Sequence, residues 1–511
     1  MTSSSVVLAP DDTYNQQLTD NVHPPDWQNP TPDARYNLVI IGAGTAGLVM
    51  AAAAAGLGAR VALIERHLMG GDCLNVGCVP SKGMIRAARA WAAASDAVEF
   101  GLSLPPGTER DFPTAMARMR RLRAGISRLD SAERFKELGV AVYIGEGRFT
   151  APDAVTVGET VLRFSRAAIC TGARAAVPPV PGLEDAGYLT NETVFSLTAL
   201  PQRLAVIGAG PIGCELAQAF ARFGSEVTLI EQTSHILPRE DSDAAMVVQK
   251  RMTRDGVSFA FEAAIDNVAA DAEAKRVHYS VAGETRELVV DEILVGVGRA
   301  PNVEGLGLDI AGVAYEQAGV IVDSYLRTTN KQIYAAGDIC FPFKFTHTAD
   351  AMAQIVIQNA LFPHPFGLGL ASTESLIIPW CTYTEPEVAH VGMYAADAQA
   401  KGLDVETFTQ SLDEVDRAVL DGADDGFARL HVKRGTDEIL GATIVAADAG
   451  NLISEVTVAM KAGAGLSTIA ATIHPYPTQA EVLRKAANQM RKARFSDRQK
   501  SILRTLFAWR R

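Results

Sequence analysis

The strongest constraint on the fold is a glycine-rich turn that occurs twice in this 511-residue chain. The two turns read Gly42-Ala43-Gly44-Thr45-Ala46-Gly47 and Gly208-Ala209-Gly210-Pro211-Ile212-Gly213. Each follows an apolar run that predicts a buried parallel strand, and each opens an apolar helix. Glu65 and Glu231 stand about twenty residues beyond the first and second turn. The repeat predicts an α/β fold that contains two Rossmann-like dinucleotide-binding domains.

Each turn has the residue types that a dinucleotide needs. The glycines let the backbone approach a pyrophosphate, the helix N-terminus attracts its charge, and the acid accepts hydrogen bonds from ribose hydroxyls. The alternative is a tight turn in an α/β fold that binds nothing. Two such sites suit a flavin and a nicotinamide. Because a carboxylate at Glu231 accepts from a free ribose 2′-OH and repels a 2′-phosphate, the sequence predicts a preference for NADH over NADPH.

Composition limits the class of protein. A hydrophobic content of 48% can fill several cores, and the length suggests roughly three or four domains. The net charge of -12 argues against a nucleic-acid-binding protein held by phosphate contacts. Six cysteines in a chain of this length do not indicate a secreted fold held by disulfides.

The N-terminal residues bear on location. Residues 1–32 are polar, carry several acids, and lack the basic start and apolar block of a signal peptide. We therefore expect a cytoplasmic protein, where a disulfide is more often catalytic than structural. Residues 38–60 are apolar and long enough to span a bilayer. Glycines interrupt them and they divide into strand, turn, helix and strand, so we expect no membrane span there.

A short segment with two cysteines carries the clearest chemistry. It reads Gly70-Gly71-Asp72-Cys73-Leu74-Asn75-Val76-Gly77-Cys78-Val79-Pro80-Ser81-Lys82. If the segment is helical, Cys73 and Cys78 lie a little over one turn apart, and their sulfurs come within disulfide reach. The start of a helix and the charge of Lys82 both favour a thiolate. The alternative is two buried cysteines that never bond.

The whole string closely resembles the redox-active disulfide of the flavin-dependent pyridine nucleotide-disulfide oxidoreductases. This group includes dihydrolipoyl dehydrogenase, glutathione reductase and mercuric reductase. Three further segments resemble family motifs: the strand end at residues 167–172, the element at residues 296–302, and the flavin motif that ends at Asp338. The resemblance covers roughly residues 36–490 and implies a homodimer with bound FAD and NAD.

The resemblance implies a division of the chain into domains. The expected third fold is an α+β dimerisation domain at the C-terminal end. The expected segments are an N-terminal extension (1–34), the FAD-binding domain (35–173 and 299–372), the NAD(P)-binding domain (174–298), the dimerisation domain (373–490) and a basic tail (491–511).

The resemblance also implies a set of cofactor-binding residues and no resident metal site. These residues are Gly42, Gly44, Thr45, Ala46, Gly47, Glu65, Gly71, Cys73, Lys82, Gly147, Thr171, Gly172, Gly208, Gly210, Pro211, Ile212, Gly213, Glu215, Glu231, Gly298, Arg299, Asp338, Thr346 and His347.

By the same resemblance, electrons pass from NAD(P)H through FAD to a Cys73–Cys78 disulfide and on to a thiol-reactive acceptor. Lys82 and Glu215 are expected to pair beside the flavin N5, where hydride arrives. Cys78 is expected to be the thiolate next to the flavin, and Cys73 the thiol that meets the substrate.

One departure from the family lies near the C-terminus. In dihydrolipoyl dehydrogenase and glutathione reductase a His stands just before Pro-Thr, and a Glu orients it as the general base from the partner subunit. Alignment of Pro477-Thr478 and Glu481 places Tyr476 at that position, with His474 two residues too early. A tyrosine with a pKa of about 10 is a poor base at neutral pH. Mercuric reductase also has a Tyr at this point, where it helps to handle a thiol-bound metal ion.

A second departure concerns cysteines. No cysteine lies beyond Cys381, so the chain lacks the C-terminal cysteine pair with which mercuric reductase delivers Hg(II). Three functions stay open: a reductase of a thiol-bound metal ion or unusual disulfide, a dihydrolipoyl dehydrogenase variant that acts with a lipoylated protein, and a flavoprotein redox sensor. The candidate catalytic residues are Cys73, Cys78, Lys82, Glu215, Tyr476 and Glu481.

Two charged segments complete the predictions. Residues 83–135 are expected to be helical, with Arg118, Arg120, Arg121 and Arg123 on a solvated face. The tail combines basic residues with interspersed apolar ones. We expect a solvated or dimer-packed helix there, and contact with a membrane surface is the alternative.

Overall fold

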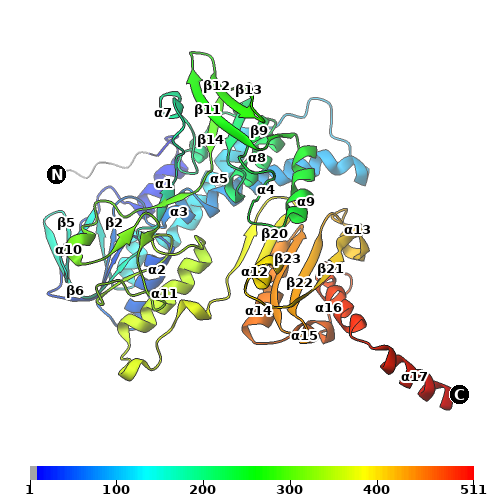
Figure 1. Cartoon of the computed structure of the whole chain (residues 1–511). Coiled ribbons are helices and arrows are strands. Elements are labelled where there is room, and N and C mark those ends of the chain that lie inside the picture. The colour runs from blue at the N-terminus through cyan, green and yellow to red at the C-terminus, as the bar shows by residue number, and fades with distance from the viewer. Residues whose placement is uncertain (1–7) are drawn as a thin grey trace. The chain divides into compact units, whose positions relative to one another are not determined.

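A computed structural model describes residues 8–511, and the chain forms two compact units (Figure 1). The first unit is the chain to Gln232 together with Gly256–Leu376, and the second is Thr233–Asp255 together with Ile377–Arg511. Both helices and sheets occur in each unit, so the predicted mixed α/β class is confirmed.

The main sheet of the first unit contains the first glycine-rich turn. Its parallel strands pair in the order β3-β2-β1-β6, and β18 joins the far side of β6. Antiparallel strands β4 and β5 extend it from β6. The strands are β1 Tyr36–Ile41, β2 Val61–Glu65, β3 Val140–Ile144, β4 Gly147–Ala151, β5 Ala154–Val157, β6 Thr160–Ile169 and β18 Ile333–Ala335. The pairing of β18 brings the chain after residue 298 back to the sheet that holds the first turn.

A second parallel sheet, in the order β10-β9-β8-β14, contains the second turn. Its strands are β8 Arg203–Ile207, β9 Glu226–Ile230, β10 Val257–Ala260 and β14 Glu292–Val295. An antiparallel sheet follows, with β11 Ala263–Ala270, β12 Lys275–Val281 and β13 Glu284–Val290. Short pairs join β7 Ala173–Ala175 to β15 Arg299–Pro301, and β16 Tyr315–Glu316 to β17 Gly319–Val320.

The helices of this unit cover the sheets and carry the cysteines. They are α1 Thr13–Val22, α2 Thr45–Gly56, α3 Gly71–Asn75, α4 Cys78–Asp96, α5 Phe112–Ser127, α6 Ala132–Glu137, α7 Leu183–Ala186, α8 Pro211–Phe223, α10 Leu308–Ala311 and α11 Thr346–Leu361. Five single 3₁₀ turns lie at 97–100, 128–130, 194–196, 365–367 and 373–375. The helical prediction for residues 83–135 is largely confirmed, because α4, α5 and α6 occupy most of it.

One prediction about this unit is wrong. The arginines of α5 do not all lie on a solvated face, because Arg120 and Arg123 are only 6% and 5% exposed. The N-terminal extension contains α1, which packs beside α5 and buries Leu18 and Val22 (Figure 1). Residues 1–7 of that extension lie outside the described part of the chain. The two buried arginines bond to the start of this extension, Arg120 to Asp12 and Arg123 to Asn15.

The second unit is built on an antiparallel sheet in the order β19-β20-β23-β22-β21. The strands are β19 Pro379–Thr382, β20 Glu387–Gly392, β21 Val405–Ser411, β22 Phe427–Lys433 and β23 Ile439–Ala446. The helices are α9 Ser242–Arg254, α12 Ala395–Ala400, α13 Asp416–Leu420, α14 Ala449–Lys461, α15 Leu466–Ala471, α16 Glu481–Ala493 and α17 Asp497–Trp509. Apolar residues of β20, β22, β23, α14 and α16 share one core.

The basic tail forms α17, in which no residue is buried and Trp509 is 83% exposed. Within residues 8–511, each helix is too short or too polar to cross a membrane.

Candidate active site

The first glycine-rich turn is closely packed on its inner side. Gly42 has a φ of +103°, and a Cβ there would lie 2.3 Å from the carbonyl oxygen of Cys170. A Cβ on Gly47 would lie 1.9 Å from the oxygen of Gly42. The backbone N–H of Ala43 donates to Glu65 Oε2 at 2.8 Å. Desolvation raises the pKa of Glu65, and this hydrogen bond opposes the rise.

The second turn repeats this geometry. Gly208 has a φ of +98°, and a Cβ on Gly213 would lie 1.9 Å from the oxygen of Gly208. The N–H of Ala209 donates to Glu231 Oε2 at 2.7 Å. Pro211 opens α8, where its missing N–H costs nothing. A Cβ on Gly210 would meet no atom within 4 Å, so the space in front of α8 is open.

The residues present fit two dinucleotides. Helices α2 and α8 begin at Gly44 and Gly210, neither of which supplies a side-chain cap. The N–H groups in the first turn of each helix, other than at Pro211, which has none, are therefore available to a diphosphate. Gly172 and Gly298 also border open space, at φ values of +66° and +138°. Bound FAD would lie at the first turn and a nicotinamide dinucleotide at the second.

The two cysteines lie in different helices, contrary to a single helical segment. Cys73 is in α3, which ends at Asn75, and Cys78 is the first residue of α4. Gly77 separates them at φ −126° and ψ −116°, and a Cβ there would lie 2.7 Å from the oxygen of Asp72. The break places Cys78 at the N-terminus of a 19-residue helix, where the helix dipole favours a thiolate.

The two thiols have opposite acidities. A hydrogen bond from Cys73 is the largest cause that lowers the pKa of Cys78, which falls to about 6. The Thr346 hydroxyl, 3.5 Å from Cys78 Sγ, and the charge of Lys82 act in the same direction. The same hydrogen bond, with desolvation, raises the pKa of Cys73. The structure carries both as thiols, so the Cys73–Cys78 disulfide stays a prediction.

The structure brings Lys82 and Glu215 together. Lys82 Nζ on α4 lies 2.8 Å from Glu215 Oε2 on α8. The carboxylate side chain is 6% exposed and the lysine 37%. This ion pair joins the cysteine helix to the helix that follows the second turn.

Arg299 links two acids of the first unit. Its Nη1 lies 3.0 Å from Asp72 Oδ2, and its Nε lies 3.4 Å from Asp338 Oδ2. Desolvation raises the pKa of Asp338, and the charge of Arg299 opposes the rise. Sequence reasoning missed Asp72, although it directly precedes Cys73 in the cysteine string. The role of Asp72 depends on its contact with Arg299, and the two residues are over two hundred positions apart in the sequence, so no local pattern indicated it.

The remaining residues predicted to bind cofactor lie along the same unit. Thr171 Oγ1 donates to the carbonyl of Asn302 at 2.9 Å. A Cβ on Gly71 would lie 2.6 Å from Cα of Gly44, so the cysteine turn abuts the first glycine-rich turn. A Cβ on Gly147 would meet Ile64 at 3.1 Å. The ring of His347 stacks on Phe345, with centroids 5.3 Å apart.

The C-terminal candidates lie in the second unit, each beside a charged or acidic partner. Tyr476 is 70% exposed and donates its hydroxyl to Asp416 Oδ2 at 2.9 Å. That hydrogen bond is the main cause of a raised pKa of Tyr476. Glu481 is 4% exposed and pairs with Arg484 at 2.9 Å. His474 Nε2 lies 2.9 Å from Glu455 Oε1.

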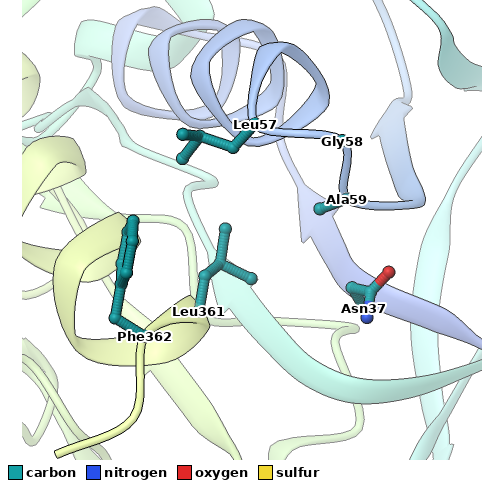
Figure 2. A pocket seen from close by; sticks show the side chains of 6 residues that line it. All are labelled: Asn37, Leu57, Gly58, Ala59, Leu361 and Phe362. Atoms are coloured by element: carbon teal, nitrogen blue, oxygen red, sulfur yellow. The ribbon is translucent and has the colours of Figure 1, made fainter.

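A separate pocket of about 270 Å³ lies where α2 ends near the C-terminal end of α11 (Figure 2). It is lined by Asn37, Leu57, Gly58, Ala59, Leu361 and Phe362. None of these residues is among the predicted site residues, and none is charged.

Comparisons with known proteins place this geometry in a family. Residues 36–354 match the pyridine nucleotide-disulphide oxidoreductase model, and residues 378–487 match its dimerisation domain. The chain belongs to the class I pyridine nucleotide-disulfide oxidoreductases, which use FAD with NAD(P)H. The dimerisation domain supports a homodimer.

The similar proteins include both mercuric reductases and dihydrolipoyl dehydrogenases. A mercuric reductase of Acidithiobacillus ferrooxidans is 35% identical over 479 residues, which is 91% of this chain and 85% of that protein. A dihydrolipoyl dehydrogenase of Chlamydia muridarum is 34% identical over 462 residues, 88% and 96% of the two chains. The Cu(II) complex of the HOCl-induced flavoprotein disulfide reductase RclA from Escherichia coli is similar with a TM-score of 0.77 and 30% identity, covering 88% and 98%.

Proposed function

We propose that this oxidoreductase passes electrons from NADH to a thiol-bound metal ion rather than to a lipoyl group. The observation that carries the proposal is the hydrogen bond from Tyr476 to Asp416. Tyr476 stands where the family's dithiol-oxidising members have a histidine base. A phenol that donates to a carboxylate and has a raised pKa cannot accept a proton near neutral pH.

The proposed roles follow from the contacts. FAD would be held at the first glycine-rich turn, and when bound it would supply the two-electron chemistry between NADH and the cysteine pair. Cys78 carries the thiolate, Lys82 and Glu215 form the ion pair beside the nicotinamide path, and Cys73 meets the acceptor. For a divalent ion bound by two thiolates, one M(SR)₂, one NADH and one H⁺ are converted to the metal, two RSH and NAD⁺. Glu231 and its hydrogen bond to Ala209 support the preference for NADH.

The predicted boundaries between the FAD-binding, NAD(P)-binding and dimerisation domains also stay a prediction.

The test is anaerobic NADH oxidation by the FAD-loaded homodimer. Hg(II) in excess thiol and lipoamide are compared at equal concentration, with Cys73→Ser as the control for the cysteine pair. We expect turnover with a metal ion that the control abolishes. Turnover with lipoamide alone would overturn the proposal.

A second candidate, dihydrolipoyl dehydrogenase activity, is favoured by one contact. The His474 side chain is 5% exposed and lies 2.9 Å from Glu455, which is the type of pair that orients a general base. The variants Tyr476→Phe and His474→Ala separate the candidates. A metal reductase should lose about tenfold in kcat/KM in the first variant, the scale of one hydrogen bond. A lipoamide enzyme should lose activity mainly in the second.

A further inference from the structure

We propose that the N-terminal segment 8–34 is a clamp that positions the turn carrying Cys73, with Asn15 and Arg123 as its positioning residues. The segment precedes the part of the chain that matches the family model, which begins at residue 36. The inference rests on the proposed redox role of Cys73 and Cys78. It explains why two arginines of α5 are buried.

The clamp holds the end of the cysteine turn through Arg123. The Nη1 of Arg123 donates to the carbonyl of Asn75 at 2.6 Å, and Asn75 is the last residue of α3. Its Nη2 donates to Asn15 Oδ1 at 2.7 Å. Asn15 and Arg123 are 3% and 5% exposed. A buried planar guanidinium with two fixed acceptors therefore joins α1 to the end of the turn.

The clamp also holds the start of the turn. The N–H of Met69 donates to the carbonyl of Val22 at 3.1 Å. Asn75 Nδ2 then donates to the carbonyls of Met69 and Gly71, at 3.0 and 2.9 Å. The turn is thus bonded to α1 directly at its start and through Arg123 at its end. The side chain and carbonyl of Asn75 take part in the contacts at both ends.

Apolar packing and an ion pair fix α1 in place. Leu18 and Val22 lie in the same buried cluster as Met69 and Leu74. Asp12, the N-cap of α1, accepts from Arg120 Nε at 2.6 Å. Isolated helices as short as five residues do not persist, so α3 takes its geometry from these neighbours. The position of Cys73 decides whether its thiol reaches Cys78.

The test is the pH dependence of alkylation of each cysteine by iodoacetamide in the reduced protein, read by peptide mapping. A second readout is the long-wavelength charge-transfer absorbance between the Cys78 thiolate and the flavin in the two-electron-reduced holoenzyme. Asn15→Ala removes the acceptor of Arg123. We expect this variant to raise the pH midpoint of Cys78 alkylation by about one unit, a tenfold change in proton affinity. The reason is that a displaced Cys73 no longer donates a hydrogen bond to Cys78.

Two further variants make the test specific. Asn21→Ala removes one hydrogen bond from the same helix, to Ser127 Oγ at 2.9 Å, and should leave the midpoint unchanged. Asn15→Asp keeps an acceptor for Arg123 and should return the alkylation midpoint of Cys78 to the wild-type value. If Asn15→Ala does not fold, Arg123→Lys replaces it, since an ammonium lacks the planar fork that holds both acceptors.

The outcomes separate two failures. A Cys78 midpoint in Asn15→Ala, or in its replacement Arg123→Lys, equal to that of the wild type overturns the clamp. A shift of the same size in Asn21→Ala also overturns it, because the effect is then general destabilisation. If the wild-type protein shows no long-wavelength absorbance and no turnover, the proposed redox function fails instead.

Discussion

The two glycine-rich turns have nearly the same local geometry but different neighbours. Both place an alanine N–H on the following acid, at 2.8 Å in the first turn and 2.7 Å in the second. Gly42 and Gly208 both face a backbone carbonyl, of Cys170 and of Gly296, but in the first turn the middle glycine, Gly44, also abuts Gly71 of the cysteine turn. The second opens to free space at Gly210. The comparison teaches that one sequence pattern builds the same backbone turn twice, while the middle glycine is covered in the first turn and open in the second.

The largest effect should come from filling the inner side of each turn. Gly47→Ala and Gly213→Ala both place a Cβ 1.9 Å from a backbone oxygen. We expect Gly47→Ala to abolish FAD retention. Gly213→Ala should keep the flavin absorbance yet lose about a hundredfold or more in kcat/KM for NADH, since misplacement by 1 Å has such costs.

Gly56→Ala is the matched control for this steric argument. A Cβ on Gly56, in α2, meets nothing within 4 Å, so flavin content and NADH kinetics should not change. Equal loss of flavin in Gly47→Ala and Gly213→Ala would erase the distinction between the turns.

A smaller effect should come from neutralising the two acids. Glu231→Gln keeps an oxygen for the Ala209 N–H and removes the charge that repels a 2′-phosphate. We expect the ratio of kcat/KM for NADPH over NADH to rise about tenfold, the scale of one charged contact. Steady-state kinetics with both nucleotides measure it. Glu65→Gln, the equivalent change at the first turn, should leave the ratio unaltered, and a similar rise there would contradict the assignment.

The smallest effect concerns the thiolate beside the first turn. A pKa lowered to about 6 means that Cys78 is mainly thiolate at neutral pH and is protonated as the pH falls through 6. The thiolate–flavin absorbance of the reduced enzyme should therefore disappear between about pH 7 and 5. Thr346→Val removes a donor to Cys78 and should move that midpoint upward by a fraction of a pH unit. A midpoint unchanged by Thr346→Val, or a band that persists at pH 4, would refute this account.

Much of the fold could be predicted because its signals are local. The glycines of each turn and the apolar runs before them specify strand, turn and helix within a short window. Lys82 and Glu215 could be paired only by resemblance, since they lie on helices far apart in sequence. The break at Gly77 was missed, because a helix ending and restarting within three residues leaves little periodic signal. The buried arginines were missed because charge alone suggests solvent.

By itself, the sequence determined the two dinucleotide folds, the cysteine pair and the family, because short-range patterns of glycine, acid and cysteine carry that information. The family resemblance already implied that Cys78 is the thiolate, but only the tertiary structure supplies the physical causes: the Cys73 hydrogen bond, Thr346 and the start of α4. The tertiary structure also placed α1 beside α5 and the turn that carries Cys73. Asn15, Asn75 and Arg123 come from distant parts of the chain, and only folding brings their hydrogen-bonding groups together.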